Sequence, residues 1–178
     1  MKIYIFDLET VCDNEQTITN REIIQFGIVE VYKTNEHTWN IGRKNCWNIQ
    51  PRQKITPYCT QLTGIKWRQL KNQPFIEDIL PKIFQRYSLN TPWASWGNDP
   101  LLIEKNCIER NMPIPTFSHF VNLSTHWKCM HADMKNIGLK HAMEQYNIPF
   151  EGQAHNALTD AENTAKLFMQ MFPIAPHT

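Results

Sequence analysis

The chain has 178 residues, of which 42% are hydrophobic and 20% are charged, and its formal net charge is +1. This length predicts one domain, residues 1–178, that buries a core of its own, and the composition excludes a disordered chain. A net charge so close to zero does not by itself indicate an anionic partner.

The first part of the chain reads as three strands. Residues 2–7 and 22–32 are apolar and rich in β-branched and aromatic residues, which predicts buried strands. A third, more polar strand is expected within 38–50, with a hairpin turn at Asn35-Glu36. The segment from Pro57 to Gly64 predicts a short helix that stops at glycine.

Helices alternate with strands in the rest of the chain. Apolar residues recur at helical spacing through 75–87, and a short buried strand is expected at 93–96. The remaining predicted elements are a helix that starts at Asn98-Asp99-Pro100, a strand at 117–123, and helices at 136–146 and 159–172. This order predicts an α/β fold with a mixed central β-sheet flanked by α-helices. Ala157, Ala161 and Ala165 recur every four residues, and along the helical part such small side chains are expected to allow close approach to the sheet.

Two further features concern the environment of the protein. No apolar run approaches the ~20 residues of a membrane-spanning helix, and Asp7 comes too early for a signal peptide. The five cysteines form no CxxC pair, so we expect reduced, mostly buried thiols. A cytoplasmic protein without a membrane partner is therefore expected.

Basic and aromatic residues are interleaved in the segment from Lys33 to Lys71, which contains eight basic residues and one acidic residue. The aromatic residues are Trp39, Trp47, Tyr58 and Trp67. Such a segment can follow a phosphate backbone while its rings stack on bases. A solvated charged face over core aromatics is the commoner arrangement and is favoured on this feature alone.

Asp7 and Glu9 form the first group of carboxylates. Side chains alternate along a strand, so both project to one side while Leu8 faces the other. Two adjacent carboxylates repel each other unless a cation lies between them, and hard oxygen ligands suit Mg²⁺ or Mn²⁺. On this motif alone, a strand that simply ends in a polar loop is the more frequent explanation.

Two later motifs add acidic groups and a histidine. Asp99 follows a predicted strand and starts a helix, a position that helix capping alone can explain. Asp160 lies near the start of the last helix, where Thr159 and Glu162 match a capping box. His155 precedes that helix in a loop, where an imidazole can act as a general base.

Together these motifs resemble the DEDDh branch of the DEDD (DnaQ-like) exonuclease superfamily. The resemblance extends over nearly the whole chain. Within the superfamily, the sequence is most similar to the 3′ histone-mRNA exonuclease (Eri-1-like) and KapD-like groups. The resemblance rests on five segments: Phe6-Asp7-Leu8-Glu9-Thr10, Glu22-Ile-Ile-Gln-Phe-Gly27, Leu62-Thr63-Gly64-Ile65, Ser95-Trp96-Gly97-Asn98-Asp99 and His155-Asn-Ala-Leu-Thr-Asp-Ala161. The fold implied by the resemblance is RNase H-like.

The resemblance also implies an activity and its residues. The implied reaction is 3′→5′ hydrolysis of single-stranded RNA or DNA from 3′ ends, with RNA favoured and nucleoside 5′-monophosphates as products. Two Mg²⁺ or Mn²⁺ ions would be held by four carboxylates, and His155 would take a proton from the attacking water. The four carboxylates are Asp7, Glu9, Asp99 and Asp160.

Substrate contacts are expected from Thr10 through its backbone, from Leu62 and Thr63 on the last nucleotide, and from Trp96 beneath its base. A core position suits Trp96 equally well. Base selectivity should be low, because stacking tolerates any base. Three lysines ahead of the last motif are expected to contact phosphates further back: Lys128, Lys135 and Lys140.

Other functions stay open at this point. An oligoribonuclease-like activity on very short RNA would use the same carboxylates and histidine. A DNA-directed repair or proofreading role is also open, because DNA differs from RNA at this site only by the 2′ hydroxyl of each nucleotide. A non-catalytic binding or scaffold module on the same fold is the alternative outside enzymes. The sequence leaves the oligomeric state unassigned.

Overall fold

A computed structural model describes residues 1–15, 17–34, 38–132 and 135–174 of the chain. Its centre is a five-stranded sheet in the order β3-β2-β1-β4-β5. β1 pairs antiparallel with β2 and parallel with β4, so the predicted mixed sheet is confirmed. The strands are β1 (Lys2–Thr10), β2 (Ile23–Lys33), β3 (Trp39–Asn48), β4 (Trp93–Ser95) and β5 (Phe120–Asn122).

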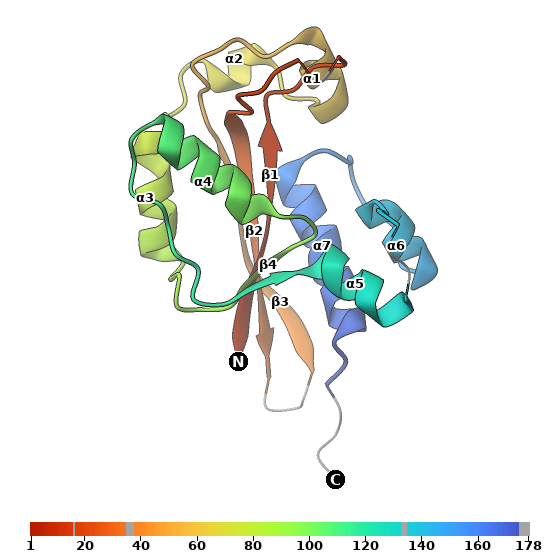
Figure 1. Cartoon of the computed structure of the whole chain (residues 1–178). Coiled ribbons are helices and arrows are strands. Elements are labelled where there is room, and N and C mark those ends of the chain that lie inside the picture. Colours follow the sequence, from red (N-terminus) through yellow and green to blue (C-terminus); the bar gives the residue numbers. More distant parts are fainter. Residues whose placement is uncertain (16, 35–37, 133–134, 175–178) are drawn as a thin grey trace.

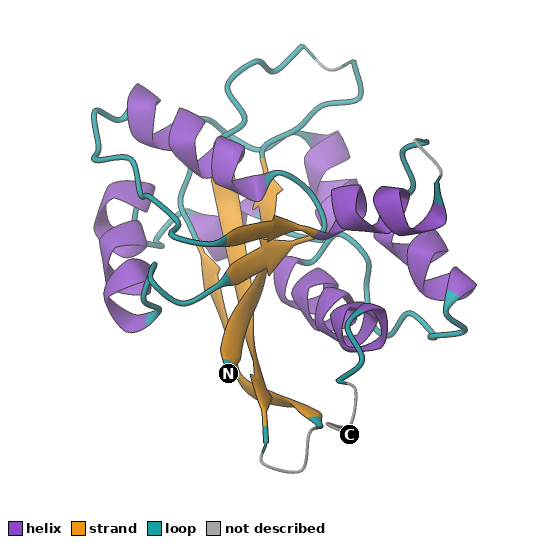
Figure 2. Ribbon diagram, turned by 60° about the horizontal axis from the view of Figure 1, so that its bottom comes forward, coloured by secondary structure: helices purple, strands orange, loops and turns teal. Residues whose placement is uncertain are grey.

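Seven helices among the described residues surround the sheet. In Figure 1, α3 and α4 lie on one side of the sheet, α5, α6 and α7 lie on the other, and α1 and α2 lie at the end of β1. Figure 2 shows the sheet between the two helical layers. The helices are α1 (Pro57–Thr63), α2 (Trp67–Leu70), α3 (Ile76–Arg86), α4 (Asp99–Glu109), α5 (Leu123–His131), α6 (Leu139–Gln145) and α7 (Ala157–Met171).

The alternation of side chains along β1 divides the core in two. Tyr4, Phe6 and Leu8 pack in a cluster with apolar residues of α3 and α4. Ile3 and Ile5 point to the other face, in a cluster with residues of α7. Asp7 and Glu9 therefore continue the face of the sheet that α7 covers.

α7 approaches the sheet most closely at Gly27. A Cβ atom at Gly27 would lie 2.3 Å from the carbonyl carbon of Ala157, so only glycine permits this contact. Ala157, Ala161 and Ala165 are all fully buried. The predicted role of this alanine repeat, close approach to the sheet, is confirmed.

Several expectations about elements were wrong. α7 begins at Ala157 rather than near Asp160, because the side chain of Asn156 caps it and accepts the N–H of Thr159 at 3.2 Å. The strand expected at 117–123 is only β5, and Leu123 already starts α5, which the sequence did not indicate. The hairpin turn expected at 35–36 lies outside the described residues.

The cysteines also differ from expectation. All five are free thiols, but only Cys59 and Cys107 are buried, while Cys46 and Cys129 are exposed. Cys46 and Cys129 lie on β3 and α5, and each of these elements has a side that is exposed to solvent. No helix in the described part of the chain has the length and apolar character needed to cross a membrane.

Candidate active site

The four carboxylates come from three elements that end at one edge of the sheet. Asp7 and Glu9 lie near the end of β1, and Asp99 starts α4 directly beyond β4, which runs parallel to β1. Asp160 lies in the first turn of α7. Asp99, Glu9 and Asp160 all raise the pKa of Asp7 by charge repulsion, so the four groups are close neighbours.

The surroundings of the cluster raise the pKa of all four carboxyls while no cation is bound. Burial is the largest cause of the raised pKa of Asp7, followed by the three other acids. Burial, then repulsion by Asp160 and Asp99, raises the pKa of Glu9 to about 8. Burial raises the pKa of both Asp99 and Asp160 to about 6. A cation bound among these groups would offset the repulsion that contributes to these raised pKa values.

Asp99 is held by its own loop. Hydrogen bonds from Ser95 and from the backbone at Gly97 partly offset the effect of burial on its pKa. The alternative explanation of its position, that Asp99 caps the helix, was wrong: the N-cap is Asn98, whose side chain makes no capping bond, and Asp99 is the first residue of α4. Its side chain is 7% exposed, so it faces the cluster rather than solvent.

His155 stands beside Asp160 in the turn before α7. Its backbone has φ of 61°, in the left-handed region, and its N–H donates to Oδ2 of Asp160 at 2.9 Å. Its side chain is exposed, as expected for a loop residue ahead of the helix. A non-glycine residue in this conformation is uncommon outside sites that over-determine it.

The donor atoms of the cluster fit a divalent metal ion. Glu9, His155 and Asp160 each offer one ligand atom, and these three atoms lie within 4.8 Å of one another. Oδ1 of Asp160 is buried without a hydrogen-bond partner. A buried carboxylate oxygen normally has a partner, so a bound cation is a chemically consistent one.

The start of α7 is tied to the sheet as well as capped. Ala157 donates its N–H to Oε1 of Gln25 at 2.8 Å, and Nε2 of Gln25 donates to Oδ1 of Asn48 at 3.0 Å. Gln25 pairs with Glu9 in the sheet register. The contact therefore fixes the first turn of α7, which carries Asp160, relative to β1.

Leu62 and Thr63 have different surroundings. Leu62 lines a cavity of about 380 Å³ beyond the end of β1. Thr63 is 2% exposed, and its hydroxyl donates to the carbonyl of Cys59 at 2.8 Å. The expected contact of the Thr63 side chain with a nucleotide is therefore not available, because its hydroxyl is used inside α1.

Thr10 and Trp96 are also largely covered. Thr10 is 5% exposed, which leaves only its backbone for the expected contact. Trp96 is partly buried between the clusters of α7 and α6, and its Nε1–H donates to the carbonyl of Ile137 at 3.2 Å. Trp96 acts in packing, which was the alternative already open for it.

The cavity contains residues that the motifs did not assign. Tyr58 lies on α1 and is 37% exposed, while Cys12, Asp13, Ile18 and Arg21 come from the loop after β1. Tyr58 had a signal as one aromatic of the basic segment. Arg21 had none, since it stands outside that segment and next to an acidic residue.

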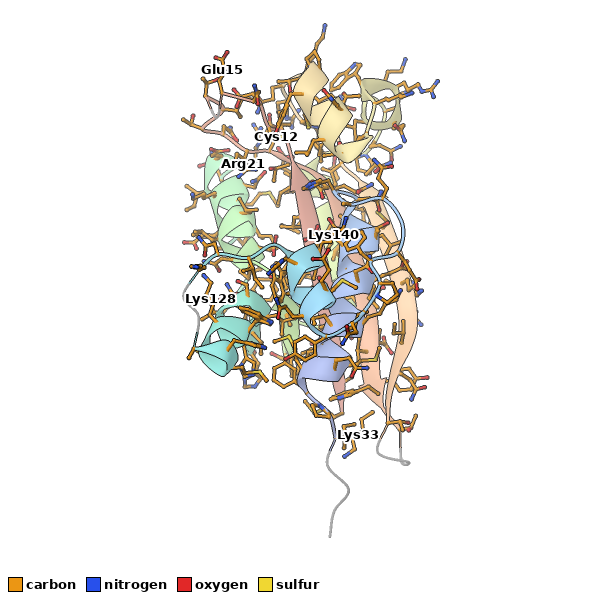
Figure 3. The ribbon with its side chains drawn as sticks, turned by 90° about the vertical axis from the view of Figure 1, so that its right-hand side faces the viewer. Cys12, Glu15, Arg21, Lys33, Lys128 and Lys140 are labelled. Carbon is orange, nitrogen blue, oxygen red and sulfur yellow. The ribbon has the colours of Figure 1, made fainter. Side chains whose placement is uncertain are left out.

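The rest of the basic segment supports the commoner arrangement. Trp47 packs edge-on against Phe26, and Nε1–H of Trp39 donates to the carbonyl of Phe172 at 2.7 Å. Lys44 forms an ion pair of 2.9 Å with Glu162. Two of the three lysines expected to contact phosphates further back lie on α5 and α6. Nζ of Lys128 donates a hydrogen bond to Asn136. Figure 3 shows Lys128 and Lys140 below the end of the molecule that carries Cys12 and Arg21.

Known proteins share this sequence pattern and this fold. ERI1 exoribonuclease 2 of Danio rerio is 24% identical over 203 residues, covering 95% of this chain and 34% of that protein. ERI1 exoribonuclease 3 of Homo sapiens is 25% identical over 176 residues, covering 92% of this chain and 51% of that protein. The chain thus spans between a third and a half of the length of these relatives.

Solved structures agree with the expected RNase H-like fold. The nuclease domain of 3′hExo, described as a DEDDh family member bound to rAMP, superposes with a TM-score of 0.84 at 20% identity, covering 96% of this chain and 90% of that one. The family model for exonucleases (RNase_T) matches residues 4–168. Because that match takes in all four carboxylates, His155 and nearly the whole fold, the chain belongs to the exonuclease family.

Proposed function

We propose that this chain is a 3′→5′ exonuclease that hydrolyses phosphodiester bonds at the 3′ ends of single-stranded RNA, accepts DNA less well, and releases nucleoside 5′-monophosphates. The convergence of Asp7, Glu9, Asp99 and Asp160, with His155 beside them, is the observation that carries this proposal. The names of the relatives, which are exoribonucleases, favour RNA.

The four carboxylates would hold two Mg²⁺ or Mn²⁺ ions. When bound, such ions lower the pKa of water and stabilise negative charge on the leaving oxygen. Asp160 offers its unpartnered Oδ1 for this purpose, while its Oδ2 stays on the N–H of His155. The pKa of about 8 for Glu9 shows how strongly that carboxyl needs a positive neighbour at neutral pH.

His155 would act as the general base. Its imidazole is exposed and lies within 4.8 Å of ligand atoms of Glu9 and Asp160, which puts it beside the reacting groups. A neutral imidazole can take a proton from water near pH 7, and Asp160 stabilises the imidazolium that results.

The cavity beyond β1 would hold the last nucleotide. Tyr58 and Leu62 give it an aromatic ring and an aliphatic side chain to pack on a base. The backbone of Thr10 lies between this cavity and Glu9 along the chain. A cavity that receives one terminal residue is what restricts hydrolysis to ends.

The test is a gel assay on single-stranded RNA and DNA, labelled at the 5′ or the 3′ end, with Mg²⁺, Mn²⁺ or EDTA. We expect stepwise shortening from the 3′ end that EDTA stops. Asp7→Asn should abolish cleavage with unchanged circular dichroism, while Asp78→Asn, an exposed acid on α3, should leave it intact. Full activity of a folded Asp7→Asn protein would refute the proposal.

Two alternatives are separated by the same materials. An oligoribonuclease-like enzyme would cleave a dinucleotide faster than a long oligonucleotide. A scaffold module would show no cleavage and no two-site Mn²⁺ binding in a calorimetric titration.

A further inference from the structure

Asn163 is a buried polar residue of α7 that takes no direct part in the proposed reaction. It is 1% exposed and lies within the helix, three residues after Asp160. Asparagine is unfavourable inside a helix, and burial of its amide is costly unless the polar atoms have hydrogen-bond partners. The partners of this amide therefore indicate why an asparagine stands there.

Every polar atom of the Asn163 side chain is hydrogen-bonded, and two of its bonds go to one residue. Oδ1 of Asn163 accepts the N–H of Glu151 at 3.1 Å, and Nδ2 donates to the carbonyl of Glu151 at 2.8 Å. Nδ2 also donates to the carbonyl of Thr159 at 2.9 Å. This set needs an acceptor and two donors on one planar group, which an amide supplies. Asn163 thus holds both backbone polar groups of Glu151 against α7.

Glu151 begins the loop that leads to His155, and Figure 1 shows this connection between α6 and α7. The N–H of His155 donates to Oδ2 of Asp160 at 2.9 Å, so α7 holds the loop at both ends. Within the loop, Gly152 has φ of 85°. A Cβ atom at Gly152 would lie 2.9 Å from Cγ2 of Thr159, so the loop crosses directly over the first turn of the helix. A loop held in this way leaves its last residue few positions.

An ion pair on the surface also reaches Glu151. Nζ of Lys166 lies 2.6 Å from Oε2 of Glu151, whose side chain is 70% exposed. Exposed pairs of this kind contribute little, because water and salt screen them and two long side chains lose freedom. Hydrogen bonds from a buried amide are shielded from water and are stronger. The amide of Asn163, rather than the ion pair, is therefore expected to fix the path of the loop.

On the basis of the proposed function, we propose that Asn163 is a positioning residue, which fixes the loop of residues 151–155 so that the imidazole of His155 stands beside Glu9 and Asp160. A general base must lie within hydrogen-bond reach of its water, and a displacement of about 1 Å can slow a reaction about 100-fold. The side chain of His155 is exposed, so side-chain packing does not supply this precision. The backbone of the loop supplies it instead.

The experiment is a double-mutant cycle of Asn163→Leu and His155→Ala, with kcat and KM measured on single-stranded RNA. Leucine has nearly the shape of asparagine and adds no charge, but it makes none of the three hydrogen bonds. With His155 present, Asn163→Leu should lower kcat about tenfold or more and change KM less than about twofold. In the His155→Ala protein it should lower kcat no further, because no imidazole remains to be positioned. Equal losses in the two backgrounds would overturn the inference.

Two control variants separate positioning from stability. Leu167→Ala removes a fully buried side chain of α7, so it should lower the melting temperature and leave kcat unchanged where all variants are folded. Lys166→Gln removes the ion pair with Glu151 and should leave kcat unchanged as well. A fall in kcat for Leu167→Ala as large as that for Asn163→Leu would assign the effect to stability and reject the inference.

Gly152→Ala replaces Asn163→Leu if that variant does not fold. Its Cβ strains the exposed loop and removes no buried contact, so it should show the same loss of kcat and the same dependence on His155. Additive losses in this second cycle would again reject the positioning role.

Hydrogen exchange gives a readout that does not depend on activity. The amide of His155 bonds to Asp160, which Asn163→Leu leaves in place. That amide should nevertheless exchange about tenfold faster in Asn163→Leu than in Leu167→Ala, because the loop is released at its other end. Equal exchange rates would overturn the inference while an active wild type keeps the proposed function. A wild type that degrades no RNA would refute the proposed function, and the inference with it.

Discussion

The peptide N–H of Ala157 donates a hydrogen bond of 2.8 Å to Oε1 of Gln25, across 132 positions of sequence. Both residues are buried, and Gln25 lies opposite Glu9 in the sheet. This bond sets the height of α7 on the sheet, and therefore the position of Asp160 relative to Glu9.

Gln25→Ala should lower stability and activity together. It leaves the buried N–H of Ala157 without an acceptor, which costs about 1–3 kcal/mol. Urea denaturation measures the free energy of unfolding. The rate of cleavage of single-stranded RNA should fall as well, because Asp160 moves relative to Glu9. Gln85→Ala, on the exposed face of α3, is the control. An unchanged free energy of unfolding would contradict the role given to this bond.

Gly27→Ala should be more damaging. The added Cβ would lie 2.3 Å from backbone atoms of Ala157, so α7 must move or the sheet must distort, at a cost of about 3 kcal/mol. Gly138→Ala provides a matched comparison, because nothing lies within 4 Å of a Cβ there. Thermal unfolding of the two variants should separate clearly, and similar melting temperatures would argue against the close approach.

The metal-free protein should lose stability as the pH rises. The pKa of Glu9 is raised to about 8 and those of Asp99 and Asp160 to about 6, so the folded state holds protons that the unfolded chain releases. That stability is complete below about pH 4 and is lost as the pH passes through the raised values. We expect the melting temperature in EDTA to fall by roughly 5–10 °C between pH 5 and pH 8.5.

Adding Mn²⁺ at pH 8.5 should restore most of that loss, since the ions replace the missing protons. Asp7→Asn should raise the melting temperature of the metal-free protein at this pH, because it removes one of four repelling charges. A melting temperature that does not change with pH in EDTA would show that the acids do not interact.

His155→Ala should lower kcat about 10²–10⁴-fold, the usual contribution of a general base. Mn²⁺ binding, measured by calorimetry, should persist through the carboxylates. His141→Ala on α6 is the control, since that imidazole is exposed and remote in sequence from the motif. If the loss of kcat came entirely from lost metal binding, His155 would be a ligand rather than a base.

The two sides of α1 should respond differently to substitution. Tyr58→Ala or Leu62→Ala should raise KM about tenfold, because each removes a surface on which a base can pack. Thr63→Val should instead lower thermal stability and leave KM unchanged, because its hydroxyl bonds to Cys59 inside the helix. A large effect of Thr63→Val on KM would mean that the nucleotide reaches beneath α1.

Local pattern was sufficient for part of this protein. Alternation along β1 put Asp7 and Glu9 on one face, and the spacing of Ala157, Ala161 and Ala165 indicated a helix that packs closely on the sheet. These inferences hold because side-chain direction in strands and helices depends only on residues a few positions apart. The order of the five strands and of five helices followed from the same periodicities, whereas the short helix α2 and the helix α5 were not indicated.

The tertiary structure decided what depends on contacts between distant residues. The start of α7 was misplaced because Asn156 and Gln25 outcompete the Thr159–Glu162 pattern, and Gln25 is remote in sequence. In the folded protein Thr63 is buried, while Arg21 is exposed and close enough to Glu9 to lower the pKa of that carboxyl. Neither fact is visible in the local sequence. Desolvation and charge repulsion arise only when the chain brings those groups together, so only the folded arrangement determines the electrostatics of this site.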